Sequence, residues 1–422
     1  MGNLEKCMEA DDLVNGGIRK AGRPRPAFAT MSGESRGFHL LITTLIALSV
    51  VGLICFMISY IRGHQDLGSN NVIPWGMPII VAIYLIGVSA GLHILAFFIY
   101  ILGRKEWKPI MRMAVYLAIV LISGAMISLA LDLGRPEKMW RLFVFSYLSN
   151  MNSMFAVNAI IYPCYLLADL IYLIALFCEK EKLSRLMGMM AFGWAVLTHA
   201  GTGLIFGLVA ARESWFSPLK PLEFVIVAFT SSLALLVVVI VITFKLTRRH
   251  LRPEWIISLG KLIVIFLVGL ILLIWIEELA RLYLFNPQGK EALIFMLTGR
   301  YSWVFWVFQV FLGEVVPLSV LLHPRLRKTI RGVFTAALLI VIGVFFERLY
   351  LVIPGLAYPQ SYALGKIEGL YGAVGSFPFT VVESLMSLGI FALLALFFIL
   401  GLKHLELLPT DASGEEWSIV TG

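Results

Sequence analysis

A ten-residue segment combines an acid, a base and helix-ending residues at the point where a long apolar run stops. It spans Leu131–Trp140 and reads LDLGRPEKMW. Asp132 and Arg135 lie three residues apart, and at a membrane boundary such a pair can line a polar pocket at the edge of the hydrocarbon. The same spacing is also typical of a plain helix end with a structural ion pair, so both interpretations remain open.

Further ionisable residues lie within apolar runs, where each costs about 2.5–3.5 kcal/mol on membrane-insertion scales and therefore needs a reason. They are His93, Asp132, Asp169, His199, Glu277, Glu278, Arg281, Glu314, Glu347, Arg348 and Glu383. Most fall in the expected outer third of their helices. His199 and Glu314 fall near the midplane, and His93 and Asp169 in the inner half. This asymmetry predicts a polar site that opens toward the outer face.

The seventh apolar run ends with two acids and a base. Glu277 and Glu278 precede Arg281 by four and three residues, so either acid can neutralise the base on one face of a helix. A structural ion pair is the simpler interpretation of this triplet. The order of charges in Glu278-x-x-Arg281 repeats that of Asp132-x-x-Arg135, which indicates two helix bundles related as a parallel repeat.

Two histidines lie beside small residues that permit close helix packing. His199 lies in THAGTG at 198–203, and His93 follows GVSAG at 87–91. His199 fits three roles, namely a packing residue, a haem ligand or a hydrogen-bond partner for a carbonyl ligand. His93 is expected to pair with Asp169 or Tyr165. Haem ligation by both histidines is an alternative, although they are expected at different depths.

Composition identifies the class of protein. Of 422 residues, 59% are hydrophobic and 14% are charged, whereas soluble domains carry roughly 25% charged residues. The net charge of +8 comes from residues between apolar runs and near the start of the chain, which argues against nucleic-acid binding. Four cysteines lie far apart and form no C-x-x-C pair. This spacing argues against a metal site, an iron–sulfur cluster or a c-type haem in the chain.

Ten apolar runs are long enough to cross a membrane, at about 20 residues each. They are 38–61, 77–103, 110–133, 154–178, 187–210, 222–245, 257–284, 299–322, 331–353 and 376–402. The sequence therefore predicts an all-α integral membrane protein. We expect spans 2–5 to form a first four-helix bundle (about 77–210) and spans 6–9 a second (about 222–353). The first and last helices flank them.

The ends of the chain are polar. We expect residues 1–36 to form a basic cytoplasmic tail, 37–403 the membrane domain and 404–422 a second cytoplasmic tail. With the N-terminus inside, the inner segments hold 23 Lys and Arg residues and the outer loops hold 11. Basic residues favour the cytoplasmic side, so this asymmetry predicts that both termini are cytoplasmic.

Several of these segments together resemble the NrfD/PsrC family, the membrane subunits of polysulfide reductases. They are Pro74-Trp75-Gly76, GVSAG at 87–91, LDLGRP at 131–136, Asn152-Ser153 and THAGTG at 198–203. The resemblance is closest to a ten-span branch. That branch includes membrane subunits of hydrogenase-2-type enzymes, of the Dsr and Qrc complexes and of alternative complex III.

The resemblance implies a haem-free anchor in a bacterial or archaeal cytoplasmic membrane. It implies electron exchange with menaquinone or ubiquinone in the first bundle. Whether the chain also translocates protons is left open. The implied partners are a four-cluster, ferredoxin-like iron–sulfur subunit on the outer face and a further catalytic subunit with molybdopterin, nickel–iron or multihaem centres. Membrane lipid surrounds the chain, and no nucleic acid is involved.

The resemblance also assigns roles to residues of this sequence. The implied catalytic residues are His199, Asp132 and Arg135. The implied quinone-binding residues are Trp75, Gly91, Asn152, Ser153 and Thr202. Candidates for a proton relay are His93, Asp169, Glu277, Glu278, Arg281, Glu314 and Arg348. This sequence departs from the family at the start of the second span, which reads Met77-Pro78-Ile79 where short members of the family carry a histidine and an asparagine. His199 is therefore the main candidate to bind the carbonyl oxygen of the quinone ring.

Two other functions fit part of the pattern. A haem b anchor would use the two histidines, and a secondary transporter would explain buried charges together with a repeat. A Soret band that shifts on reduction would favour the haem anchor. Substrate uptake without a redox partner would favour the transporter.

Overall fold

The computed structural model describes residues 27–141, 144, 153–283, 287–359, 361–362, 365–366 and 374–410. Within these residues, ten helices are long and apolar enough to cross a membrane, which confirms the predicted all-α integral membrane fold. Predicted site residue Asn152 lies outside the described residues, as do 1–26 and 411–422 of the predicted tails.

The helices follow the predicted apolar runs closely. They are α2 (Arg36–Arg62), α3 (Met77–Ala90), η1 (Gly91–His93), α4 (Ile94–Tyr100), η2 (Lys105–Ile110), α5 (Met111–Asp132), η3 (Pro136–Lys138), α7 (Met154–Phe177), α8 (Glu181–Gly207), α9 (Lys220–Leu246), α10 (Pro253–Tyr283), α11 (Pro287–Thr298), η5 (Val304–Val315), α12 (Val316–Leu322), η6 (Leu326–Lys328), α13 (Ile330–Ala357) and α14 (Val381–His404). Three spans are composite, because α3 continues through η1 into α4, η2 leads into α5, and η5 continues into α12.

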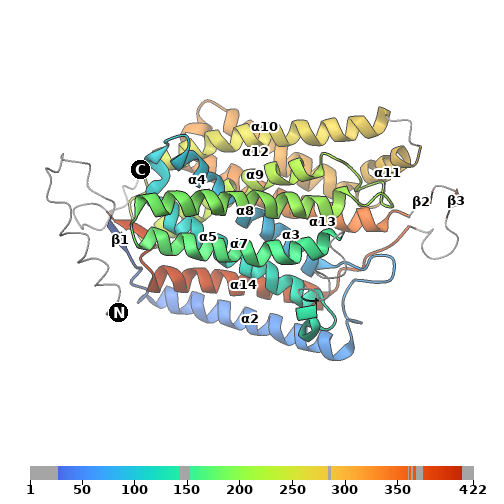
Figure 1. Cartoon of the computed structure of the whole chain (residues 1–422), viewed down its shortest axis with the longest axis horizontal. Helices are drawn as coiled ribbons and strands as arrows, with labels where there is room; N and C mark the ends of the chain where they lie inside the picture. The colour runs from blue at the N-terminus through green and yellow to red at the C-terminus, as the bar shows by residue number, and fades with distance from the viewer. Residues whose placement is uncertain are drawn as a thin grey trace.

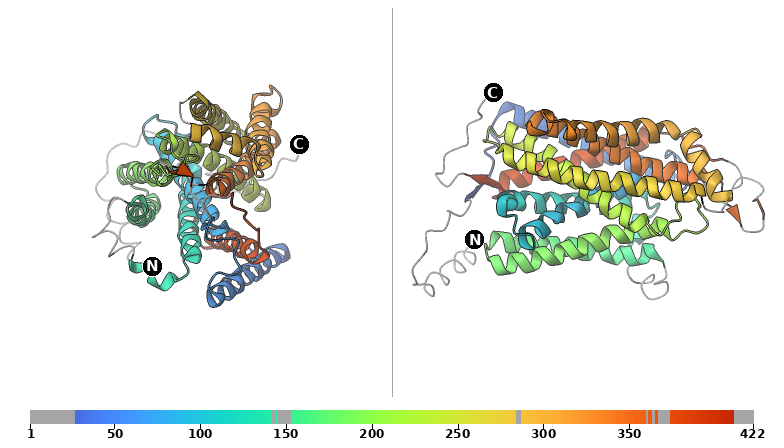
Figure 2. Two further views of the ribbon diagram at one scale, coloured as in Figure 1. Left: turned by 90° about the vertical axis from the view of Figure 1, so that its right-hand side faces the viewer. Right: turned by 90° about the horizontal axis from the view of Figure 1, so that it is seen from above.

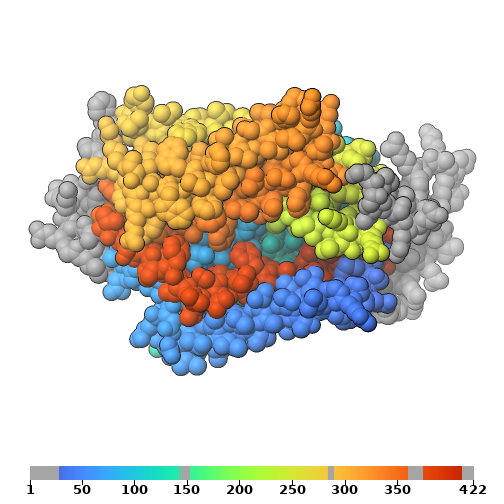
Figure 3. Space-filling view, turned by 180° about the vertical axis from the view of Figure 1, so that it is seen from behind, coloured from blue at the N-terminus to red at the C-terminus, as the bar shows by residue number. Residues whose placement is uncertain are grey.

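The spans pack as two neighbouring groups (Figure 1). Helices α3, α5, α7 and α8 pack around one another, and α9, α10, η5–α12 and α13 form the second group. Helix α3 also packs against α9 and α13, so it is buried on nearly all sides. The end-on view in Figure 2 places it near the centre of the molecule. Helices α14 and α2 lie side by side along one flank (Figure 3), where α14 contacts α5.

Short strands mark the two ends of the helix bundle. Strands β1 (Ala27–Ala29) and β4 (Leu408–Thr410) pair in antiparallel fashion at one end, called the β1–β4 end below. At this end Arg112 lies over the ring of Phe28, 3.7 Å from its centre. The predicted tails are thus joined to each other by a β-ladder. Strands β2 (Ser361–Tyr362) and β3 (Gly365–Lys366) form a second antiparallel pair between α13 and α14.

The eighth span differs from its prediction in its start and in its backbone. It starts at Val304 rather than near residue 299, because residues 299–301 form a turn after the separate helix α11. Its first twelve residues form a π-helix, η5. Such segments are rare and occur frequently at functional sites. Buried Gln309 and Glu314 lie on η5, five residues apart, and line one small cavity.

Two close helix crossings depend on glycine. Gly313 of η5 lies against Gly343 of α13, and a Cβ atom on Gly343 would come within 2.3 Å of the Gly313 Cα atom. A similar crossing joins Gly52 of α2 to Gly389 of α14, where a Cβ atom on Gly52 would lie 2.7 Å from the Gly389 Cα atom. Small residues at such crossings allow backbones to approach and pack in a membrane.

We expect Gly343→Ala to lower the free energy of unfolding by about 1–3 kcal/mol, because the added methyl group overpacks the crossing. Unfolding in detergent, followed by circular dichroism, measures this change. Gly37→Ala is the matched control, since nothing lies within 4 Å of the added Cβ atom there. Equal unfolding midpoints for both variants would contradict the prediction.

Candidate functional site

His199 lies deep in the first bundle, in the C-terminal half of α8. Its side chain is 1% exposed. It faces α3 at Gly87, where a Cβ atom would lie 2.9 Å from the imidazole Cε1 atom. The ring of Phe224 on α9 is 5.3 Å away between centroids. Within the described residues, neither imidazole nitrogen has a hydrogen-bond partner. A buried imidazole in this state can donate to, or accept from, a ligand oxygen.

The predicted pair of Asp132 and Arg135 is not formed within the described residues. Helix α5 ends at Asp132, and Leu133 has an extended backbone that leads the chain away from the helix. Arg135 is therefore exposed, whereas Asp132 is half-buried. In the seventh span the helix continues to Tyr283, so Glu278 and Arg281 remain one turn apart and form an ion pair at 3.6 Å.

Glu383 of α14 lies near Asp132 and has a structural contact that the sequence did not reveal. Its carboxylate accepts hydrogen bonds from the backbone N–H groups of Met77 and Gly68. Met77 is the first residue of α3, and that helix has no side-chain cap of its own. A carboxylate at a helix N-terminus satisfies free N–H groups and the helix dipole. Part of the predicted outer-leaflet charge is thus a cap supplied by another helix.

Aromatic side chains surround Trp75 at the end opposite β1–β4. Its ring stacks on Trp215, with centroids 5.5 Å apart and planes 14° from parallel. The rings of Phe155 and Phe206 meet it edge-on at 5.5 and 5.9 Å. Half-exposed Trp75 and exposed Phe155 place this cluster at the surface of the first bundle.

The other predicted quinone residues have mixed surroundings. Thr202 is buried, and its hydroxyl lies 2.9 Å from that of Tyr162. Ser153 is half-buried and precedes the first residue of α7. Gly91 packs against α9 rather than lining open space, because a Cβ atom there would lie 2.1 Å from the carbonyl oxygen of Ala228.

His93 forms the predicted pairs with both Asp169 and Tyr165. Its Nε2 atom lies 2.9 Å from the Asp169 carboxylate, and its Nδ1 atom lies 3.1 Å from the Tyr165 hydroxyl. All three side chains are buried. Because both ring nitrogens are engaged, this arrangement does not fit haem ligation by His93 and His199.

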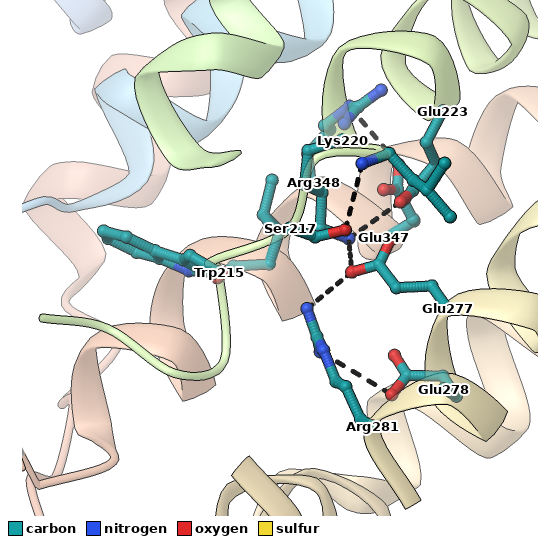
Figure 4. A network of polar contacts seen from close by, with 11 residues as sticks. Trp215, Ser217, Lys220, Glu223, Glu277, Glu278, Arg281, Glu347 and Arg348 are labelled. Atoms are coloured by element: carbon teal, nitrogen blue, oxygen red, sulfur yellow. Dashed lines mark hydrogen bonds and ion pairs between the residues drawn. The ribbon is translucent and has the colours of Figure 1, made fainter. Parts of the chain in front are cut away.

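The second bundle contains a network of buried charges near the end opposite β1–β4 (Figure 4). Lys220 lies 2.8 Å from Glu223 and 3.1 Å from Glu277, and Arg281 pairs with Glu277 and Glu278. Arg348 contacts Glu347 at 3.3 Å. We call these seven residues the second-bundle network. Its four carboxyl groups face three cations, so full ionisation would leave one uncompensated negative charge.

A small cavity adjoins the second-bundle network. It measures about 30 Å³ and is lined by Ser214 and Gln309 together with six network residues, Lys220, Glu223, Glu277, Glu278, Arg281 and Glu347. The cavity of Glu314 shares Gln309 and Glu347 with it. The guanidinium of Arg348 lies over the ring of Phe224, 4.0 Å from its centre. Since His199 packs near the same ring, Phe224 joins the first-bundle histidine to the second-bundle network.

Sequence reasoning missed Lys220 and Glu223. The predicted sixth span started at residue 222, so Lys220 was placed in an outer loop, but α9 starts at Lys220. The available signal was the Lys-x-x-Glu spacing at the start of a span, which places both side chains on one helical face.

No cluster of three or more His, Cys, Asp or Glu residues suited to holding a metal ion occurs in the part of the chain that the structure describes. The described residues offer groups for hydrogen bonding and proton exchange. An imidazole, several carboxyl groups and tyrosine hydroxyls all lie at membrane depth.

Comparison with known proteins gives one family. The family model described as "Polysulphide reductase, NrfD" matches residues 65–360. A protein of Archaeoglobus fulgidus named Hdr-like menaquinol oxidoreductase integral membrane subunit is 33% identical over 395 residues. These cover 92% of this chain and 98% of the relative.

Two more distant relatives each match about two thirds or more of this sequence. The integral membrane subunit of menaquinone reductase from Nitratidesulfovibrio vulgaris is 26% identical over 325 residues, covering 71% of this chain and 76% of the relative. The C subunit of polysulfide reductase from Wolinella succinogenes is 22% identical over 310 residues, covering 68% of this chain and 96% of the relative.

Proposed function

The chain belongs to the polysulphide reductase NrfD family, and we propose that it is the quinone-reactive membrane subunit of a multi-subunit respiratory oxidoreductase. Two relatives are named for menaquinol or menaquinone, and their similarity extends over most of this chain. Menaquinone is therefore the favoured substrate, with ubiquinone as the alternative. The family result supports the resemblance predicted from the sequence.

The observation that carries the proposal is the buried, unpaired imidazole of His199 in the first bundle. A quinone ring needs a hydrogen-bond partner at its oxygen and an apolar crevice for its tail. His199 supplies the first, and the aromatic cluster around Trp75 supplies apolar surface for the tail. Asp132 lies at the end of α5 and is half-buried, and its carboxylate can accept a proton.

In this mechanism the substrate exchanges two electrons and two protons as quinone and quinol interconvert. His199 holds a ring oxygen by a hydrogen bond and exchanges a proton with it, because an imidazole has one nitrogen that donates and one that accepts. Asp132 passes protons to or from water at the end of α5. Arg135, which the structure places on the surface, contributes positive charge there rather than a bond to Asp132.

The electrons require a partner, because the four cysteines lack the spacing of a cluster site. We propose a four-cluster, ferredoxin-like iron–sulfur subunit on the outer face, which connects to a further catalytic subunit. We propose that the β1–β4 end is cytoplasmic. The excess of Lys and Arg in the predicted inner segments supports this orientation in a bacterial or archaeal cytoplasmic membrane.

The second-bundle network supports an additional role in proton translocation. Its carboxyl groups outnumber its cations, so a single proton shared among Glu223, Glu277, Glu278 and Glu347 neutralises it. The adjoining cavities extend from this network to Glu314 near mid-membrane. We assign these residues a structural or proton-relay role beside the quinone site.

Photolabelling tests the quinone site. We expect an azidoquinone to label the purified complex on the outer halves of α5 and α8, the segments that carry Asp132 and His199. Excess menaquinone should reduce this labelling about tenfold by competition, and mass spectrometry of the labelled peptides measures it. Labelling that menaquinone does not compete, or that is confined to the second bundle, would overturn the site.

A further inference from the structure

Helix α7 carries a polar stripe that the proposed function does not yet use. Its members are Asn158, Tyr162, Tyr165, Asp169 and Tyr172. They are spaced four, three, four and three residues apart, so they share one face of the helix. All five are buried, with exposed fractions of 7% or less. At 1.5 Å per residue, the stripe extends over about 21 Å of membrane depth.

The inner half of the stripe contains two groups of polar contacts, and the rings of His93 and Tyr172 lie next to each other between them, with centroids 6.3 Å apart. The Tyr165 hydroxyl lies 3.1 Å from Ser89 on α3 and 3.1 Å from His93. His93 in turn lies 2.9 Å from Asp169. One turn closer to the β1–β4 end, the Tyr172 hydroxyl donates to that of Tyr100 on α4, at 3.4 Å.

The Tyr172–Tyr100 contact lies next to a cavity. Tyr100 lines a cavity of about 110 Å³ at the β1–β4 end. Polar and charged side chains share its lining, namely Lys108, Arg112, Glu179, Glu181 and Ser184. Water occupies about 30 Å³ per molecule in the liquid, so a polar cavity of this size holds several waters. The aqueous phase at this end therefore reaches the hydroxyl of Tyr100.

The outer half of the stripe leads toward His199. The Tyr162 hydroxyl lies 2.9 Å from that of Thr202, which donates to the backbone carbonyl of Thr198 at 2.8 Å. Thr198 directly precedes His199. Asn158 donates to the carbonyl of Gly201 on the same helix α8. The contacts between α7 and α8 thus extend the stripe to the neighbourhood of the proposed quinone site.

Three side-chain atoms along these contacts do not fit a purely structural network. Within the described residues, the amide oxygen of Asn158, the Oδ2 atom of Asp169 and the hydroxyl of Thr198 are buried without a hydrogen-bond partner. Buried polar groups in a packed interior are nearly always satisfied, either by protein or by ordered water. Orphaned groups beside a line of hydroxyls indicate that water takes part in these contacts.

We propose that this seam, which joins Tyr100, the α7 stripe and Thr198, conducts protons between the aqueous phase at the β1–β4 end and the quinone at His199. Hydroxyl, imidazole and carboxylic acid groups both donate and accept, so a proton can enter at one side of each group and leave at the other. This inference rests on the proposed function, and it adds the route and the side of the membrane from which one of the two protons comes.

Electrons and protons balance in both directions of the reaction. Reduction of one quinone forms two O–H bonds with two electrons from the iron–sulfur partner and two protons, one through the seam and one through Asp132. Oxidation of quinol breaks the same two bonds, returns the two electrons to the iron–sulfur partner and releases the protons by the same two routes. Because the proposed electron partner docks at the opposite end, each turnover moves charge across the membrane in either direction.

The test uses the whole complex in proteoliposomes. Exposed Cys178 at the β1–β4 end reports orientation through an impermeant thiol reagent. A pH-sensitive dye on the β1–β4 side follows proton exchange while electron transfer to a quinone is recorded. We expect Tyr172→Phe and Asp169→Asn each to slow this proton exchange tenfold or more, with competition by menaquinone in photolabelling unchanged.

Tyr116→Phe is the matched control. This substitution also removes a tyrosine hydrogen bond, from the hydroxyl to the Phe397 carbonyl, but Tyr116 lies between α5 and α14 and outside the seam. We expect it to keep the wild-type rate. Tyr172→Phe keeps the ring and removes only the hydroxyl, so it remains informative if Asp169→Asn does not assemble.

The outcomes separate the two proposals. Wild-type proton exchange in Tyr172→Phe and Asp169→Asn, or protons that appear only on the opposite side of the wild-type complex, would overturn the seam and leave the quinone site intact. A wild-type complex without quinone-linked electron transfer and without competed photolabelling would overturn the proposed function itself.

Discussion

His199→Ala is expected to lower quinone-linked electron transfer about 100-fold or more while the complex remains assembled. General acid–base catalysis by a positioned residue contributes about 10²- to 10⁴-fold, and alanine removes the hydrogen bond to the ring oxygen as well. Quinone reduction or quinol oxidation by the purified complex in detergent, with subunit content checked by gel filtration, measures the effect. Asp132→Ala is expected to act in the same direction, because it removes the proton acceptor at the end of α5.

The control for this experiment is His39→Ala. His39 lies on the first turn of α2, with its side chain exposed and far from the first bundle. It should retain wild-type turnover. Full activity in both His199→Ala and Asp132→Ala would remove the site assignment, even if photolabelling still reported a bound quinone.

Lys220→Met is expected to lower the free energy of unfolding by about 3–5 kcal/mol, which is the cost of removing one partner from a buried ion pair. The Lys220 ammonium lies between the carboxylates of Glu223 and Glu277, and all three side chains are buried. Methionine fills similar space but leaves both carboxylates without this cation. Chemical unfolding of the purified protein in detergent measures the change.

The matched comparison is a surface pair of the same type. Lys108 pairs with Glu181 at 3.3 Å, but their side chains are 41% and 69% exposed. Lys108→Met should therefore cost less than about 1 kcal/mol. The double variant Lys220→Met with Glu277→Gln should recover part of the loss, because fewer unpaired charges remain buried. Equal losses for Lys220→Met and Lys108→Met would show that the buried network is not held by its charges.

The spans and the local pairs were predictable from the amino-acid sequence alone. Apolar runs give the ten helices because the free energy of membrane insertion adds up residue by residue along the sequence. The contacts of Arg281 with Glu277 and Glu278 followed from helical spacing. The motifs around Asp132 and His199 identified the family. The roles of these two residues stay predictions, which the variants above test.

Predictions from residue spacing were wrong where a helix ended between the two residues, and hydropathy did not reveal a change of helix type. Asp132 and Arg135 have the same spacing as Glu278 and Arg281, yet α5 ends at Asp132 and separates them. The π-helix η5 was also unpredicted, because hydropathy records how apolar a segment is and not how its backbone hydrogen bonds are arranged.

Only the tertiary structure showed which helices pack against one another. Folding brought Lys220 to Glu277, placed Glu383 at the start of α3, and aligned the α7 stripe with Tyr100 and Thr202. Hydropathy favours no helix pair over another, because lipid is as apolar as the helices themselves. Close glycine crossings and the pairing of buried polar groups determine which helices pair, and both depend on residues far apart in the sequence.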